Sequence, residues 1–212
     1  MSTQSIIAEQ RVLIHNINWQ LFESLLDAMA HNNSSRISYI QETLEFMSPL
    51  WLHESTNRRI EAMILALTEE LNMPLEMAGS LTLKRADMVV GKEPDSCYYI
   101  QNAAQVRGKI NIDLSIDPPP DLAIEIDISR SFLNQLEIYA KLGVGEVWIY
   151  DGNNIRFYHL ENLQYINSES SLTFPMLYGK KVIEYLSECQ TIGVPLAVRN
   201  IKLWIQKQSS QK

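Results

Sequence analysis

The segment from residue 118 to 129 (PPPDLAIEIDIS) constrains the fold most, because three prolines precede a regular alternation of acidic and apolar residues. Proline fixes φ and pushes the residue before it out of the helical region, so the chain enters this segment in an extended conformation. In a strand, Asp121, Glu125 and Asp127 fall on one face and the apolar residues on the other. The pattern predicts a strand that is half core and half acidic.

A row of carboxylates is costly to bury unless a cation neutralises it. A second run with β character, EPDSCYYI (93–100), places Asp95 directly after Pro94. If the two strands pair, Asp95 and Glu125 meet. Hard oxygen ligands with no histidine or cysteine cluster nearby favour Mg²⁺ or Mn²⁺ over Zn²⁺. The sequence therefore predicts a divalent metal held by Asp95 and Glu125.

Composition limits the class of protein. With 212 residues, 46% of them hydrophobic, the chain is long enough for one globular domain with a substantial core. A net charge of −7 argues against a protein that coats nucleic acid through a diffuse basic surface, although it allows a local basic groove. Cys97 and Cys189 are too few for a disulfide framework and are expected to be reduced thiols.

The chain shows neither a basic and apolar leader nor a run of eighteen apolar residues, so we expect a cytoplasmic protein with no membrane partner. A P-loop, a dinucleotide-binding fingerprint and a CxxC pair are also absent from the sequence. These absences remove several common classes of enzyme from consideration.

The order of expected elements indicates the fold class. Hydrophobic spacing predicts helices over 18–31, capped by Asn18, and over 53–72, with a hairpin between them that turns at 41–43. A helix from Ser129 or Ser131 to Leu142, with Phe132 on its buried side, follows the acidic strand, and a strand, Asp-Gly turn and strand follow that helix. A loop at 162–171 and helices over 180–188 and 198–207 complete the chain.

The sequence of strand, helix and strand is a βαβ-like unit. An α/β fold with a central mixed β-sheet flanked by helices is therefore the expected architecture.

The order of EPDSCYYI, PPPDLAIEIDIS and IYAKLGVGEVWIYDG resembles a family of restriction-endonuclease-like proteins, abundant in cyanobacteria, within the PD-(D/E)XK nuclease superfamily. The likeness includes YIQETLEFMSP and the helix that begins HES, and it covers roughly residues 18–160. It implies a restriction-endonuclease-like fold. We therefore expect a nuclease-like core at 18–160, preceded by an N-terminal arm at 1–17 with little pattern and followed by a C-terminal extension at 161–212 that packs on the core.

The resemblance assigns roles to individual residues. Pro94 and Asp95 form the PD element, Glu125 is the (D/E) element, and Glu45 corresponds to an acidic residue supplied from earlier in the chain. The family lysine stands four residues before the tyrosine of IYA, and this position is Gln135. A neutral amide keeps a hydrogen bond to the attacking water but loses the charge, so we expect a large loss of rate.

Another lysine could restore that charge. Lys141 follows Gln135 by six residues, which is about 240° of rotation around a helix, so it cannot simply replace it. Lys84, Lys92 and Lys109 remain as alternatives that the sequence does not separate.

Other polar residues have competing interpretations. Asp121 and Asp127 flank Glu125 and could be outer ligands of the metal, although Asp121 could instead cap the entry to the strand. His53 could contact phosphate, but capping of the long helix is the favoured interpretation. Three basic pairs could line a groove for backbone phosphates or could simply be solvated: Arg58 with Arg59, Lys84 with Arg85, and Arg107 with Lys109.

The sequence supports two functions. The first is a Mg²⁺-dependent endonuclease that hydrolyses DNA, in which Asp95 and Glu125 bind the metal, Glu45 assists and Gln135 orients the water. The second is a catalytically inactive protein of nuclease fold that binds nucleic acid or a protein partner. An apolar C-terminal helix with Leu203, Trp204 and Ile205 suggests a homodimer, but the same side chains could pack on their own domain.

Overall fold

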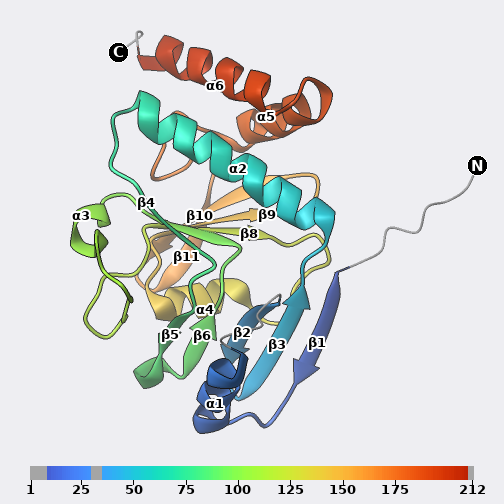
Figure 1. Ribbon diagram of the computed structural model, residues 1–212, viewed down its shortest axis with the longest axis vertical. Helices are drawn as coiled ribbons and strands as arrows, with labels where there is room; N and C mark the ends of the chain where they lie inside the picture. Colours follow the sequence, from blue (N-terminus) through green and yellow to red (C-terminus); the bar gives the residue numbers. More distant parts are fainter. Residues whose placement is uncertain (1–8, 30–34, 210–212) are drawn as a thin grey trace, which may run out of the picture.

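The computed structural model describes residues 9–29 and 35–209, and Figure 1 shows how their elements are arranged. The elements are, in chain order, β1 (Gln10–Ile14), α1 (Trp19–Met29), β2 (Arg36–Ile40), β3 (Thr43–Ser48), α2 (Trp51–Glu70), β4 (Glu76–Gly79), β5 (Leu83–Arg85), the 3-10 turn η1 (Ala86–Met88), β6 (Val90–Lys92), β7 (Ser96–Tyr99), α3 (Ala103–Val106), β8 (Leu122–Ile126), α4 (Gln135–Leu142), β9 (Glu146–Tyr150), β10 (Ile155–Glu161), β11 (Gln164–Ser168), α5 (Gly179–Thr191) and α6 (Val194–Ser209).

The strands form two sheets. A six-stranded sheet has the order β11-β10-β9-β8-β7-β4, and within it β8 and β9 are parallel and are joined through α4. This confirms the predicted βαβ-like unit and the mixed sheet. A second sheet, in the order β1-β3-β2-β6-β5, is antiparallel throughout and was not expected.

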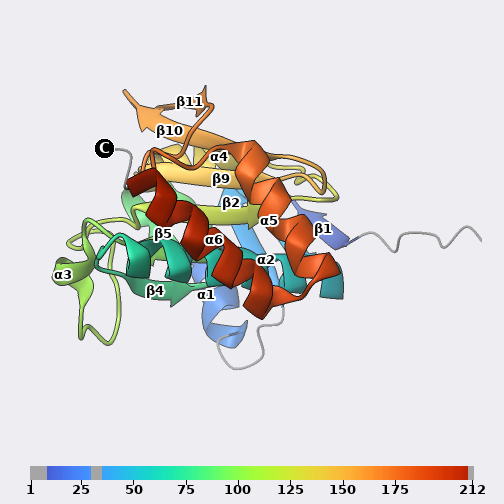
Figure 2. The same ribbon diagram turned by 90° about the horizontal axis from the view of Figure 1, so that it is seen from above.

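Helices cover both faces of the mixed sheet. Helix α2 crosses one face, with α5 and α6 stacked outside it, and α4 covers the other (Figures 1 and 2). Ile60 and Ile64 of α2 pack in one core cluster with Trp148 of β9, whereas Tyr139 of α4 packs in a second cluster with Ala123 of β8. Strand β8 is therefore buried along its whole length, including the acidic residue Glu125.

Local sequence signals are confirmed where they depend on neighbouring residues. The Asn18 side chain accepts a hydrogen bond from Leu21 N at 2.9 Å, as an N-cap does. Strands β2 and β3 form the expected hairpin, and Gln41 and Glu42 in its turn have φ of 50° and 56°. Gly143 ends α4 with φ of 83°.

Two local predictions are wrong. Helix α4 begins at Gln135, and its N-cap is Asn134 rather than Ser129 or Ser131. Phe132 consequently lies before the helix and is 67% exposed, because the preceding loop is held by hydrogen bonds to acidic residues rather than by apolar packing. Residues 164–168 form β11, which extends the mixed sheet at its edge, where a loop was expected.

The remaining structural expectations concern the ends of the chain and the cysteines. Residues 10–14 of the predicted arm form β1, which pairs with β3, and residues 1–8 lie outside the described part of the chain. Cys97 and Cys189 are both buried free thiols. Within the described residues, no helix combines the length and apolar character needed to cross a membrane.

Candidate active site

Pairing of β7 with β8 brings Asp95 and Glu125 together. Ser96 lies opposite Ile124 in the antiparallel register, so Asp95 is placed across from Glu125. An oxygen of Asp95 accepts a hydrogen bond from Ile126 N at 2.7 Å, which fixes this carboxylate beside β8. Both carboxylates are buried. The structure thus places the two predicted metal ligands side by side.

A lysine neutralises Glu125. Lys92, at the end of β6, places its Nζ 3.1 Å from Glu125 Oε2 and 3.0 Å from Ser38 Oγ. The other carboxylate oxygen accepts a hydrogen bond from the Tyr139 hydroxyl. Burial raises the pKa of Glu125, and the charge of Lys92 opposes that rise. Lys92 is therefore the cation that the buried acidic residue of β8 requires. It is one of the three lysines among which the sequence could not choose.

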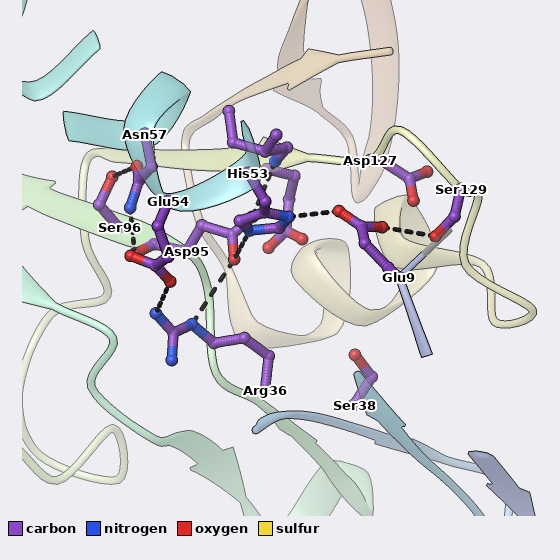
Figure 3. A network of polar contacts seen from close by, with 12 residues as sticks. Glu9, Arg36, Ser38, His53, Glu54, Asn57, Asp95, Ser96, Asp127 and Ser129 are labelled. Atoms are coloured by element: carbon purple, nitrogen blue, oxygen red, sulfur yellow. Dashed lines mark hydrogen bonds and ion pairs between the residues drawn. The ribbon is translucent and has the colours of Figure 1, made fainter. Parts of the chain in front are cut away.

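A histidine and an arginine neutralise Asp95 (Figure 3). His53 Nε2 lies 2.7 Å from Asp95 Oδ1, and Arg36 Nε lies 3.5 Å from the same oxygen. The Nδ1 atom of His53 lies 2.6 Å from Glu9 Oε1. Burial alone would lower the pKa of His53, but hydrogen bonds to Asp95 and Glu9 and the charges of both carboxylates outweigh it and raise the pKa to about 9. His53 is accordingly an imidazolium at neutral pH.

The favoured interpretation of His53 as a helix cap is wrong. Helix α2 begins at Trp51 with Leu50 as its N-cap, so His53 lies inside the first turn and points into the protein. One turn further on, Asn57 donates a hydrogen bond to the backbone oxygen of Asp95 at 3.0 Å. The first turns of α2 therefore hold the Pro94-Asp95 segment in place. The spacing within α2 gave no signal for these contacts, because their partners are distant in sequence.

Glu45 lies in a neighbouring cluster around Arg11. One oxygen of Glu45 accepts hydrogen bonds from Arg11 at 2.8 Å and from Ser131 Oγ at 2.9 Å, and the other accepts from Phe132 N at 2.7 Å. Arg11 also lies 3.0 Å from Asp127. Among the residues that the structure describes, Glu45 is hydrogen-bonded to Arg11 and to the loop after β8 rather than to Asp95 or Glu125. No sequence pattern points to Arg11, since residues 1–18 carry little pattern.

Three side chains form a row across the second sheet. Ser38 pairs with Glu45 on one side and with Lys92 on the other, so the three residues share one face of that sheet. With strands spaced about 4.8 Å apart, Glu45 and Lys92 are separated by about 10 Å. The second sheet thus aims both residues at β8 and the loop that follows it.

Gln135 is buried in the first turn of α4, and its Oε1 atom has no hydrogen-bond partner among the described residues. Tyr139, which contacts Glu125, lies four residues later and therefore on the same helix face. A buried amide oxygen without a partner is an open acceptor for a cation or a water molecule. The structure gives this residue an environment unlike that of an ordinary solvated glutamine.

The donor set fits a magnesium or manganese ion. The carboxylates of Asp95 and Glu125 offer hard oxygen atoms, and the unpartnered Oε1 of Gln135 is a further acceptor on the helix face that contacts Glu125. Residues 9–29 and 35–209 contain no cluster of three or more His, Cys, Asp or Glu side chains suited to a metal. Magnesium commonly takes one or two carboxylates and keeps several waters, so a site with two carboxylates suffices.

The other candidates have structural partners. Asp121 accepts hydrogen bonds from Ile100 N at 2.6 Å and from Asn102 N at 3.0 Å, which supports its interpretation as a cap. Five of the six basic residues of the predicted groove pair with a carboxylate; these pairs are Arg58 with Glu61, Lys84 with Glu23, Arg85 with Asp87, Arg107 with Glu76, and Lys109 with Asp117. Their charges are locally compensated, which weakens the proposed phosphate groove.

Comparison with known proteins identifies a matching family and similar solved structures. Residues 19–189 match the family described as Uma2, "Putative restriction endonuclease". A crystal structure described as a "putative nuclease belonging to DUF820 from Anabaena variabilis" is similar with a TM-score of 0.49 and 15% identity, covering 71% of this chain and 90% of that chain. No curated protein matches. The family match begins at α1, so Glu9 and Arg11 precede it.

Proposed function

Because the chain belongs to the Uma2 family, whose members are described as putative restriction endonucleases, we propose that it hydrolyses phosphodiester bonds of DNA with Mg²⁺ or Mn²⁺ as cofactor. One observation carries the proposal. Asp95 and Glu125 are buried side by side, and the unpartnered amide oxygen of Gln135 lies on the helix face that contacts Glu125.

Asp95 and Glu125 would hold the metal, with Gln135 beside them. A bound divalent ion activates water and offsets the charge that develops on the phosphate. Gln135 orients the attacking water by accepting a hydrogen bond at Oε1. The water would lose a proton as its oxygen forms a bond to phosphorus, one phosphorus–oxygen ester bond would break, and the leaving oxygen would take up a proton, so that one water is added across the ester.

His53 and Arg36 act on Asp95. Their positive charges offset the negative charge of this carboxylate, and together with Ile126 N they fix its orientation. A ligand that is held in one orientation loses little entropy when a metal binds. Glu45 supports the site indirectly, because its contacts with Ser131 and Phe132 N hold the loop between β8 and α4.

A second function is favoured by a different observation. Each oxygen of Asp95 and Glu125 already has a partner within the chain, namely His53, Ile126 N, Tyr139 or Lys92. A pair neutralised in this way needs no metal. The chain would then be a catalytically inactive protein of nuclease fold that binds nucleic acid or a protein partner.

Cleavage of supercoiled plasmid with Mn²⁺ separates the two functions. We expect the native protein to nick the plasmid, and Glu125→Ala and Asp95→Ala to abolish nicking. Glu137→Ala is a matched control, because it removes a partly exposed carboxylate from the same helix as Gln135. Intact plasmid with folded native protein would favour the inactive module. Equal nicking by native protein and Glu125→Ala would refute the assigned site.

A further inference from the structure

We propose that Lys92 supplies the positive charge that Gln135 lacks, so that the lysine of this nuclease reaches the active site from β6 instead of α4. The inference rests on the proposed function. It assigns to Lys92 a hydrogen bond and a charge directed at the water or phosphate during hydrolysis, and Lys92 itself forms and breaks no covalent bond.

The position of the ammonium group supports this role. Lys92 is buried, and its Nζ contacts Glu125 Oε2 at 3.1 Å and Ser38 Oγ at 3.0 Å. An ammonium group has three donors. These contacts use two of them within the described part of the chain, which leaves one for a water molecule or a phosphate oxygen. A buried lysine beside a ligand carboxylate can therefore act on the reacting groups.

Lys92 reaches the region that a lysine on α4 would reach. Its Nζ lies 5.9 Å from the centre of the Tyr139 ring, and Tyr139 also donates a hydrogen bond to Glu125. Gln135 lies one helical turn before Tyr139 on the same face of α4. Position 135 thus lies on the face of α4 from which Tyr139 contacts Glu125, and Lys92 contacts the same carboxylate from β6.

The other lysines considered from the sequence are held elsewhere. Lys84 pairs with Glu23 at 2.9 Å, Lys109 pairs with Asp117, and Lys141 lies 3.4 Å from Glu137. These three pairs lie on partly exposed surface, and their partners are not site residues. Lys92, in contrast, is fixed from behind by Ser38, whose strand β2 pairs with β6. The sheet therefore holds its side chain at the site.

Moving the lysine tests the proposal. The proteins to compare are the native chain, Lys92→Met, Gln135→Lys, the double variant, and Lys84→Met as a control with an exposed lysine. For each we would measure kcat for Mn²⁺-dependent plasmid nicking and, separately, Mn²⁺ binding by calorimetry. Removal of one charged donor from an active site lowers kcat by about a hundredfold or more.

We expect Lys92→Met to lose activity to that extent while it still binds Mn²⁺, because Asp95 and Glu125 remain. Lys92→Met/Gln135→Lys should recover at least about tenfold of the loss, since the charge returns from α4. Lys84→Met should stay close to the native kcat, and Gln135→Lys alone supplies the reference for the double variant. Recovery by a relocated lysine would not occur if Lys92 served only to hold its own strand in place.

Several outcomes would overturn the inference. Native kcat in Lys92→Met refutes it and leaves the proposed function intact. Loss of both kcat and Mn²⁺ binding without recovery in the double variant shows that Lys92 only positions Glu125. If Lys92→Met fails to fold, Lys92→Gln takes its place, and native kcat in that variant refutes the role. A native protein that cuts no plasmid removes the proposed function and the inference together.

Discussion

His53 is a charged imidazole buried between Asp95 and Glu9, and this makes stability depend on pH. Its folded pKa is raised to about 9, so its contribution to the free energy of unfolding is complete below about pH 6.5 and is lost as the pH rises through about 9. Burial also raises the pKa of Glu125, so the contribution of this group to the free energy of unfolding is likewise lost as the pH rises, but at a lower pH than for His53. Stability should therefore fall on the alkaline side.

Urea unfolding in EDTA measures this dependence. The free energy of unfolding of the native protein should decrease by up to about 3 kcal/mol between about pH 6.5 and 10. His53→Gln should show a flatter profile between about pH 7 and 9, because it lacks the titrating ring. An equally steep profile in both proteins would mean that other groups cause the pH dependence.

Arg11 illustrates the difference between buried and exposed ion pairs. Its side chain is 6% exposed and contacts Glu45 and Asp127, so Arg11→Met leaves two acidic groups without their cation. We expect a loss of about 3 kcal/mol in the free energy of unfolding. Arg58→Met is the matched control, because Arg58 is 62% exposed and should change stability by about 0.5 kcal/mol at most. If urea denaturation showed the same loss in the free energy of unfolding for Arg11→Met and Arg58→Met, the burial of Arg11 would be contradicted.

At the scale of residues, the sequence predicts what depends on strand alternation. The pairing of Asp95 with Glu125 follows from two strands with acidic positions. The identity of the neutralising partners does not follow from strand alternation. Lys92 lies in β6, His53 in α2 and Arg11 in β1, and tertiary packing sets how these elements are placed relative to one another. The sequence indicated that a buried acidic row needs a cation, and the fold determines which one.

The same distinction holds for whole elements. Helices α1 and α2 were predictable because their apolar spacing is local, as is the Asn18 cap of α1. The start of α4 was not, since Ser131, which looked like an N-cap, donates its hydroxyl to Glu45 instead. Strands β1 (QRVLI) and β11 (QYINS) are edge strands with largely exposed side chains. Neither sequence shows the alternation of apolar and polar residues that marks a half-buried strand.

Helix α6 packs on its own domain through one side. Ile205 is fully buried against the core that includes α2, whereas Leu203, two residues earlier, is 51% exposed. We expect Ile205→Ala to lower the free energy of unfolding by about 2–5 kcal/mol and Leu203→Ala to change it by less than about 1 kcal/mol. Urea unfolding of both variants provides the comparison, and similar losses would show that α6 is docked differently.

The homodimer expected through this helix stays a prediction. Ile205 cannot take part in a partner contact while it is buried in its own core, and Trp204 is partly covered by Tyr178 and Lys181. Leu203 remains the exposed apolar residue of the three. Any dimer through α6 would therefore bury less apolar surface than the sequence suggested.

For the molecule as a whole, charge is a constraint on the proposed function. The chain has a net charge of −7, and five of the six basic residues considered for a phosphate groove are compensated by nearby carboxylates. Long-range attraction of DNA is consequently weak. A bound divalent cation would reverse part of the local negative charge at the site, so metal binding and DNA binding are expected to be linked.

Metal binding should be visible in the stability of the whole domain. A ligand that binds only the folded state at about ten times its Kd adds about 1.4 kcal/mol to the free energy of unfolding. For a domain of this size, that gain raises Tm by about 3–6 °C. We expect such a rise on adding Mn²⁺ or Mg²⁺ to the native protein, measured by differential scanning calorimetry against an EDTA-treated sample.

The matched variants locate the effect. Glu125→Gln keeps the shape of the side chain but removes the ligand charge, so its Tm should not respond to metal. Glu137→Gln, which changes a partly exposed carboxylate on α4, should respond like the native protein. Absence of any shift in the native protein would remove the metal from the proposed function, because the partners within the chain would then hold Asp95 and Glu125 against a divalent ion.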